Sequence, residues 1–151
     1  MRRSLVAAGA ALLAVTVVGF AHADPYTHVS LTTISGQGSG AIAFSPTAKN
    51  EGTNQFDVQI TVEIHGAAPN TEFTASRNVD FVADGICTGP TFLPFSPAFT
   101  TSPGGAGSAH YEVLRGPPTL FVEGAQFDVS FRVVGTDGTV LTSECFTVTV
   151  K

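Results

Sequence analysis

The feature that most constrains the fold is a run of residues, 56–65, in which apolar and polar side chains alternate without a break. The even positions hold Phe56, Val58, Ile60, Val62 and Ile64, and every odd position is polar. A period of two places one set of side chains on each face of an extended strand, whereas a helix needs a period near 3.6. The run therefore predicts a β-strand with one face in a core and the other in solvent.

The same alternation returns near the C-terminus. Apolar residues at 127, 129, 131 and 133 alternate with polar ones, and the run then meets Gly135-Thr136-Asp137-Gly138. An Asp-Gly pair suits the tight turn of a hairpin. We expect a hairpin here, with the second strand returning through residues 139–150.

Weaker strand patterns fill the rest of the chain after residue 24. They lie at 28–34, 40–45, 72–82, 98–101 and 108–114, and clusters of Gly, Pro, Asn and Ser separate them at 36–40, 46–54, 67–70, 103–107 and 116–118. Such clusters mark turns and loops. Seven or eight short strands without covering helices predict an all-β, antiparallel, two-layer β-sandwich. No linker divides the pattern, so residues 24–151 are expected to form one domain.

The first 23 residues have the three parts of a secretory signal peptide. Arg2 and Arg3 form a cationic start, residues 5–20 are apolar and uncharged, and Ala21-His22-Ala23 ends in a small-x-small cleavage pattern. A membrane anchor is the alternative, but the apolar run is shorter than the roughly 20 residues that a spanning helix needs. We expect cleavage after Ala23 and a protein that is secreted, to the extracellular space or the periplasm, and then free of the membrane.

The charge of the remaining chain argues against two classes of partner. Removal of residues 1–23 would leave 128 residues with five basic and twelve acidic side chains, a formal net charge of −7. Such a charge repels phosphate groups. Nucleic acid and anionic membranes are therefore not expected partners.

Two cysteines, Cys87 and Cys145, make an even number in a chain expected to be exported, which predicts a disulfide between them. Strand parity puts Cys145 on the opposite face from Phe146, unless a bulge intervenes near residue 143 or 144. The bond would then join the loop around Cys87 to the last strand, outside the central core. The alternative, a reactive thiolate or a metal-binding pair, needs neighbouring bases or ligands, and none is adjacent in the sequence.

The passage 64–74 resembles part of a known family. It reads as a strand, a Pro-x-Thr-x-aromatic turn at Pro69, Thr71 and Phe73, and a second strand. This order resembles fibronectin type III and other immunoglobulin-like domains, with Phe73 in place of the usual Tyr. The resemblance implies an immunoglobulin-like β-sandwich and carries over no functional residue.

A second set of short motifs, later in the chain, resembles the secreted seven-stranded neocarzinostatin-like proteins. The motifs are a Cys-bearing loop, Phe99-Thr100-Thr101, a Gly-rich turn, Ser108-Ala109 and Arg115-Gly116. The two resemblances together cover about residues 56–150 at the level of topology. This chain departs from the pattern in having no Trp and one cysteine pair in a different position.

The motifs that could indicate catalysis, metal binding or cofactor binding are few and incomplete. Residues 36–40 are rich in Gly but lack the Lys and the helix of a phosphate-binding loop, and are interpreted as a turn. His28, His65 and His110 lack the spacing that brings two metal ligands together on one element. The chain is therefore expected to be non-enzymatic, with no cofactor and no metal.

The candidate binding surface is residues 86–99, where aromatic side chains are interleaved with prolines. Proline cannot donate to a central ladder, so this segment is expected to be a loop or an edge, where binding residues are common. Phe92 and Phe95 are the predicted binding residues, and Arg115 is a third candidate on the rim. The alternative is that these aromatic rings plug the open end of the sandwich.

These observations predict a secreted, non-enzymatic binding or interaction domain. Its partner would be a protein, a glycan or a small apolar ligand. One alternative is a small hydrolase or metal-dependent enzyme, which needs two of the three histidines within about 5 Å of each other or of a carboxylate. Another is a protease inhibitor that offers the proline-rich segment as an extended loop.

Overall fold

The protein is described by a computed structural model, which covers residues 26–49, 55–89, 91–115 and 120–151. The signal peptide predicted for residues 1–23 lies outside these ranges. The described residues form ten strands and no helix: β1 (Thr27–Ser35), β2 (Ser39–Lys49), β3 (Gln55–His65), β4 (Glu72–Asp80), β5 (Leu93–Pro94), β6 (Phe99–Thr100), β7 (Gly107–Arg115), β8 (Gln126–Gly135), β9 (Val140–Thr142) and β10 (Phe146–Thr149). All their pairings are antiparallel. The predicted all-β antiparallel class is confirmed.

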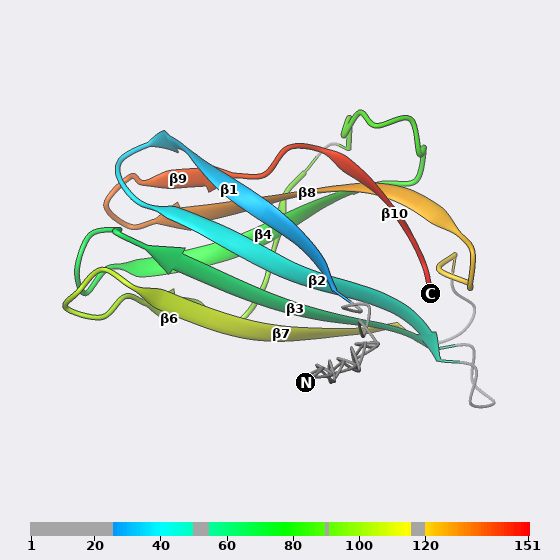
Figure 1. Ribbon diagram of the computed structural model, residues 1–151, viewed down its shortest axis with the longest axis horizontal. Coiled ribbons are helices and arrows are strands. Elements are labelled where there is room, and N and C mark those ends of the chain that lie inside the picture. The colour runs from blue at the N-terminus through cyan, green and yellow to red at the C-terminus, as the bar shows by residue number, and fades with distance from the viewer. Residues whose placement is uncertain (1–25, 50–54, 90, 116–119) are drawn as a thin grey trace, which may run out of the picture.

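The strands form one sheet that curls over onto itself (Figure 1). One layer has the order β1-β2-β3-β7, and the other is built on β4 and β8, with β9 and β10 both pairing to β8. Strand β1 belongs to both layers. Its residues 27–31 pair with β2, and its residues 32–35 pair with β9 across an irregularity between Thr33 and Ser35.

The core lies between the two layers, as the alternation predicts. The even positions of β3 and the odd positions of β8 face each other and are almost fully buried; for example, Val62 and Phe131 are both 0% exposed. Burying an aliphatic or aromatic side chain of this kind stabilises a fold by roughly 1.5–3 kcal/mol. The two-residue period therefore places these strands correctly.

The structure has more strands than the predicted seven or eight, for two reasons. The expected last strand, 139–150, is interrupted at residues 143–145, which separates β9 from β10. In the interruption, the Ser143 hydroxyl accepts a hydrogen bond from the Phe131 amide at 2.8 Å. The inward positions change there from odd, at Leu141, to even, at Val148. The other added strand is β5, within the proline-rich segment.

Strand β2 also continues past its predicted end at residue 45, through Pro46 to Lys49. The prediction treated Pro46 as the start of a turn because proline cannot donate a ladder hydrogen bond. Among the described residues, the pairing of β1 with β2 ends at Phe44, so Pro46 has one strand neighbour there, β3, in which it lies opposite Val58. Proline is tolerated at such an edge position.

Within the described residues, no helix is long and apolar enough to cross a bilayer.

Candidate functional site

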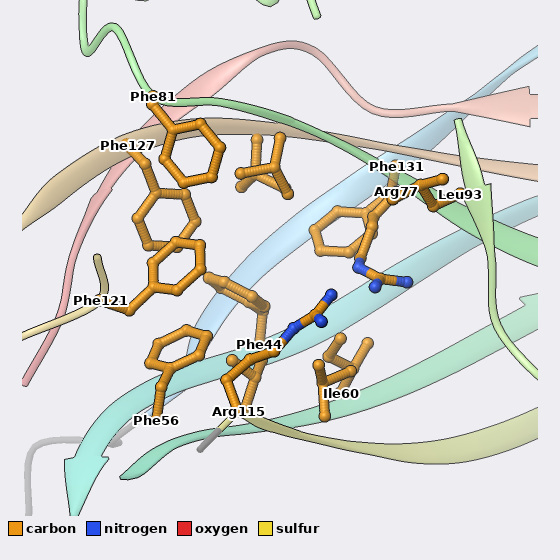
Figure 2. Close-up of a pocket in the computed structure, with 14 residues that line it drawn as sticks. Phe44, Phe56, Ile60, Arg77, Phe81, Leu93, Arg115, Phe121, Phe127 and Phe131 are labelled. Carbon is orange, nitrogen blue, oxygen red and sulfur yellow. The ribbon is translucent and has the colours of Figure 1, made fainter. Parts of the chain in front are cut away.

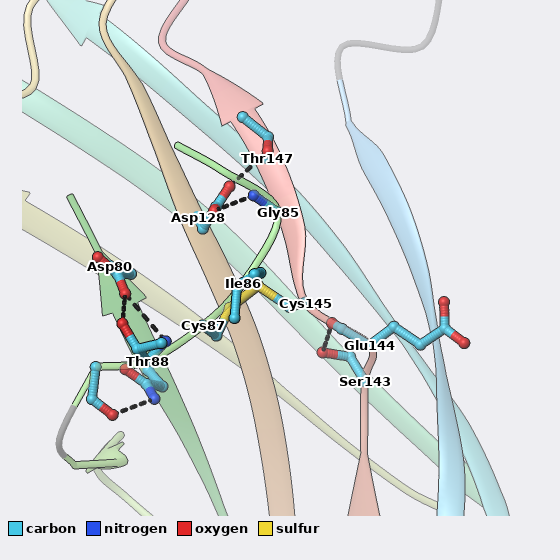
Figure 3. The surroundings of a disulfide bond; sticks show 12 residues. Asp80, Gly85, Ile86, Cys87, Thr88, Asp128, Ser143, Glu144, Cys145 and Thr147 are labelled. Carbon is cyan, nitrogen blue, oxygen red and sulfur yellow. Dashed lines mark hydrogen bonds between the residues drawn. A yellow bond between two sulfur atoms is a disulfide. The ribbon is translucent and has the colours of Figure 1, made fainter. Parts of the chain in front are cut away.

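The predicted disulfide between Cys87 and Cys145 is present, with a Cα–Cα distance of 5.6 Å (Figure 3). It joins the loop after β4 to the segment between β9 and β10, away from the central core. Asp128 holds the same loop, because its Oδ2 accepts hydrogen bonds from the amides of Asp84 and Gly85 at 2.9 and 2.6 Å. The Thr147 hydroxyl donates to its Oδ1. These bonds, that from Thr147 foremost, lower the pKa of Asp128 below its ordinary value.

Residues 91–99 of the proline-rich segment lie across the seam, defined here as the side of the curled sheet where β4 and β7 face each other without pairing. Leu93 in β5 lies opposite Arg77 in β4, and β6 pairs with the first residues of β4. Between these two contacts, the Phe95 ring enters the core and stacks on Tyr111 of β7, with 4.8 Å between ring centroids. The Tyr111 hydroxyl donates to the Pro97 carbonyl at 3.0 Å. The segment therefore closes one half of the seam.

This packing corrects the prediction that Phe95 belongs to an exposed binding patch. Its side chain is only 6% exposed, because the interrupted sheet leaves an apolar gap that the ring fills. The alternative, in which the rings plug the open end of the sandwich, anticipated a buried ring, but Phe95 fills the seam between β4 and β7. Phe92 is half-buried on the other face of β4 and β8, where the Arg132 guanidinium carbon lies 3.9 Å from its ring centroid.

The other half of the seam, beyond Arg77, opens into a cavity between the two layers (Figure 2). Its volume is about 340 Å³, within the range of small-molecule sites. Apart from two arginines the lining is apolar, and its residues come from both layers: Phe44, Phe56, Val58, Ile60, Val79, Phe81, Leu93, Val113, Phe121, Phe127, Val129 and Phe131. Four of these phenylalanines form one aromatic end of the cavity. The ring centroid of Phe121 lies 4.3 Å from that of Phe56, on which it stacks, and 4.9 and 5.5 Å from those of Phe127 and Phe81.

The two polar groups in the lining are Arg77 of β4 and Arg115 of β7. Both occupy positions where the alternation of their strands points inward: Arg77 follows Phe73 and Ala75, and Arg115 follows Tyr111 and Val113. Figure 2 shows the two guanidinium groups entering the cavity from opposite layers. Burial, and then the positive charge of Arg115, lower the pKa of Arg77. Within the described ranges, neither arginine is paired with a carboxylate.

Sequence reasoning named Arg115 as a rim residue but missed Arg77 and the cavity itself. The signal for Arg77 is present in the sequence, since it interrupts the apolar positions 73, 75 and 79 of one strand face. That signal identifies an inward charge but not its neighbours. The meeting of Arg77 with Arg115 depends on how β4 and β7 are placed across the seam, which no local pattern reveals.

The three histidines His28, His65 and His110 do not lie together. His28, Ala43, Thr61 and His110 lie in one row across four neighbouring strands, so the two histidines are roughly 14 Å apart at ~4.8 Å per strand. His65 lies at the end of β3, opposite Ser39. The His110 ring is hydrogen-bonded to Thr61 and Gln59. Among the described residues, no group of three His, Cys, Asp or Glu side chains could hold a metal ion.

The fold and cavity define the chain as a small, disulfide-linked, antiparallel all-β domain with an internal apolar site. No protein-family model matches it, and no curated protein matches it. Among solved structures, the putative ApaA protein from Bordetella pertussis aligns with 83% of this chain and 95% of its own, at 15% identity and a TM-score of 0.40. A likeness at this level carries no argument about function, so the function has to be inferred from the cavity.

Proposed function

We propose that this chain is a secreted, non-enzymatic binding domain that holds a small apolar ligand between the layers of an immunoglobulin-like β-sandwich. The cavity carries the proposal. It is enclosed by two layers of apolar side chains and reached through the open half of the seam. Phe81 and Leu93, 58% and 50% exposed, are lining residues that also reach solvent. Exposed apolar side chains continuous with an apolar cavity are typical of a site that takes up a hydrophobic molecule.

The path of the chain supports the immunoglobulin-like assignment. It passes from β3 to β4 in the other layer, returns to β7 beside β3, and passes again to β8 beside β4. Immunoglobulin-like sandwiches connect their layers in this manner. The disulfide supports the proposed compartment, because such bonds persist in oxidising surroundings outside the cytosol.

The test is whether a neutral apolar probe enters the cavity. N-phenyl-1-naphthylamine, which fluoresces more strongly in apolar surroundings, is titrated into the exported, purified protein and into two variants. Val113→Trp places a large ring in the cavity, because Val113 lines it. Leu114→Trp adds the same ring one residue away, where the side chain is 48% exposed and points outward.

We expect saturable binding to the parent protein and to Leu114→Trp, and loss of binding in Val113→Trp. Thermal unfolding of all three proteins establishes that each is folded. Equal binding to both variants would place the probe outside the cavity and overturn the proposal, as would a parent protein that binds no probe.

A further inference from the structure

The pair of inward arginines identifies the kind of ligand. Arg77 is half-buried and Arg115 is exposed at the mouth of the cavity. A charged side chain is costly to bury unless it is paired, and a like charge at close range increases that cost for Arg77. The chain carries twelve acidic residues, yet none in the described ranges pairs with Arg77 or Arg115. Among the described residues, the positive charges of Arg77 and Arg115 therefore have no carboxylate partner beside an otherwise apolar lining.

The guanidinium group of Arg77 is also held in place. The guanidinium carbon of Arg77 lies 4.7 Å from the centroid of the Phe95 ring, which is itself stacked on Tyr111. Arg115 comes from the opposite layer, as the last residue of β7. The planar fork of a guanidinium group matches a carboxylate, which can accept two parallel hydrogen bonds from it. A carboxylate between the two arginines would neutralise both and join the two layers across the open half of the seam.

We propose that the cavity binds an amphipathic carboxylate, with its apolar body among the phenylalanines and its carboxylate between Arg77 and Arg115. This inference rests on the proposed binding function and adds the head group of the ligand. The volume of about 340 Å³ would hold an aliphatic chain of on the order of ten to twelve non-hydrogen atoms with their hydrogens, at the ~30 Å³ that a water molecule occupies in the liquid. A medium-length fatty acid has this size and this division between head and body. The aromatic carbons of the naphthylamine probe carry fewer hydrogens and occupy less volume each.

The test compares three probes with the same ten-carbon body: decanoate, decanol and decylammonium. Binding is measured by calorimetry, and by displacement of N-phenyl-1-naphthylamine, below the concentrations at which the probes form micelles. Because hydrogen bonds to charged groups are among the stronger ones, we expect decanoate to bind at least about tenfold more tightly than decanol. Decylammonium should bind most weakly.

The variants assign this preference to the arginines. Arg77→Gln combined with Arg115→Gln should remove the preference for decanoate over decanol, measured as the ratio of the two affinities in the same protein. Arg132→Gln is the matched control, because it removes the same charge from the outer face of β8, where Arg132 lies over Phe92. The Arg132→Gln variant should keep the preference for decanoate over decanol.

The outcomes distinguish the carboxylate from the apolar site. Decanol binding as tightly as decanoate, or a preference that survives the double substitution, would overturn the carboxylate and leave the apolar site standing. Binding of the naphthylamine probe without binding of decanoate would also overturn the carboxylate and leave the apolar site standing. Failure of the parent protein to bind the naphthylamine probe would overturn the binding function itself, and the inference with it.

Discussion

At the scale of single residues, three arginines on three different strands show how orientation decides the role of a charge. Arg132 points to the outer face, where the Phe92 ring covers its guanidinium group. Arg77 and Arg115 point inward to the cavity. The Phe95 ring lies beside Arg77, but no carboxylate in the described ranges neutralises it. Arg132 is therefore a packing residue, whereas the positive charges of Arg77 and Arg115 remain available to a ligand.

Asp128 gives the residue-scale prediction, because its carboxylate is a central acceptor for the disulfide loop. Its hydrogen bonds lower its pKa in the folded protein from the ordinary value of 3.8. A lowered folded pKa means that the ionised group stabilises the fold above the unfolded pKa, and that this stabilisation is lost as pH falls through the folded pKa. Asp128→Asn should therefore lower the melting temperature at neutral pH and make it fall less steeply as the pH is lowered below about 4.

The measurement is thermal unfolding followed by circular dichroism from neutral to acidic pH. Glu144→Gln is the control, since it removes a carboxylate from an exposed position beside the disulfide. It should follow the parent protein closely. A pH dependence that is the same in Asp128→Asn as in the parent would contradict this role of Asp128.

At the scale of elements, the sequence was informative where a strand repeats a two-residue period and uninformative where the period stops. The alternation in 56–65 and 127–133 identified β3 and β8 and their buried faces, because period and burial have the same physical origin. The sequence allowed for a bulge near residue 143 or 144, but the break of the strand at 143–145 was not predicted, because it depends on Ser143 bonding to the backbone of β8. Composition alone could not separate an exposed aromatic loop from a plug in 91–99, since both uses favour Phe and Pro.

The element-scale prediction concerns this plug. Phe95→Ala removes a nearly fully buried ring that packs against Tyr111 and Arg77. Large-to-small changes of this kind lower the free energy of unfolding by about 3–5 kcal/mol. Phe92→Ala, in the same segment, removes a half-buried ring and should cost clearly less. Urea unfolding of the two variants and the parent measures the difference, and equal losses would contradict the distinction between plug and surface ring.

At the scale of the whole molecule, the curled sheet explains why the cavity lies where it does. Strand β1 joins the two layers along one side by pairing with both β2 and β9. On the opposite side, β4 and β7 are not paired, so side chains have to close the seam. The proline-rich segment closes one half, and the other half opens to the cavity. The site is thus a consequence of topology, which single-strand patterns do not contain.

The disulfide acts on the same scale, because it links segments that are 58 residues apart. In the chain-entropy picture, closing a loop of this length in the unfolded chain is worth about 4 kcal/mol at 25 °C. The walls of the cavity come mainly from β3, β4, β7 and β8, and none of its lining residues lies in the segments 83–89 or 143–145 that the bond joins. The disulfide should therefore contribute strongly to stability and little to the shape of the site.

Replacing both cysteines, Cys87→Ser with Cys145→Ser, should accordingly lower the free energy of unfolding in urea by several kcal/mol. At low denaturant concentration, the variant should still bind N-phenyl-1-naphthylamine with an affinity close to that of the parent. The parent protein treated with a reducing agent provides the matched comparison, since it loses the bond without a change in sequence. A variant that remains fully folded but no longer binds the probe would mean that the loop around Cys87 helps to form the cavity, which the positions of the lining residues contradict.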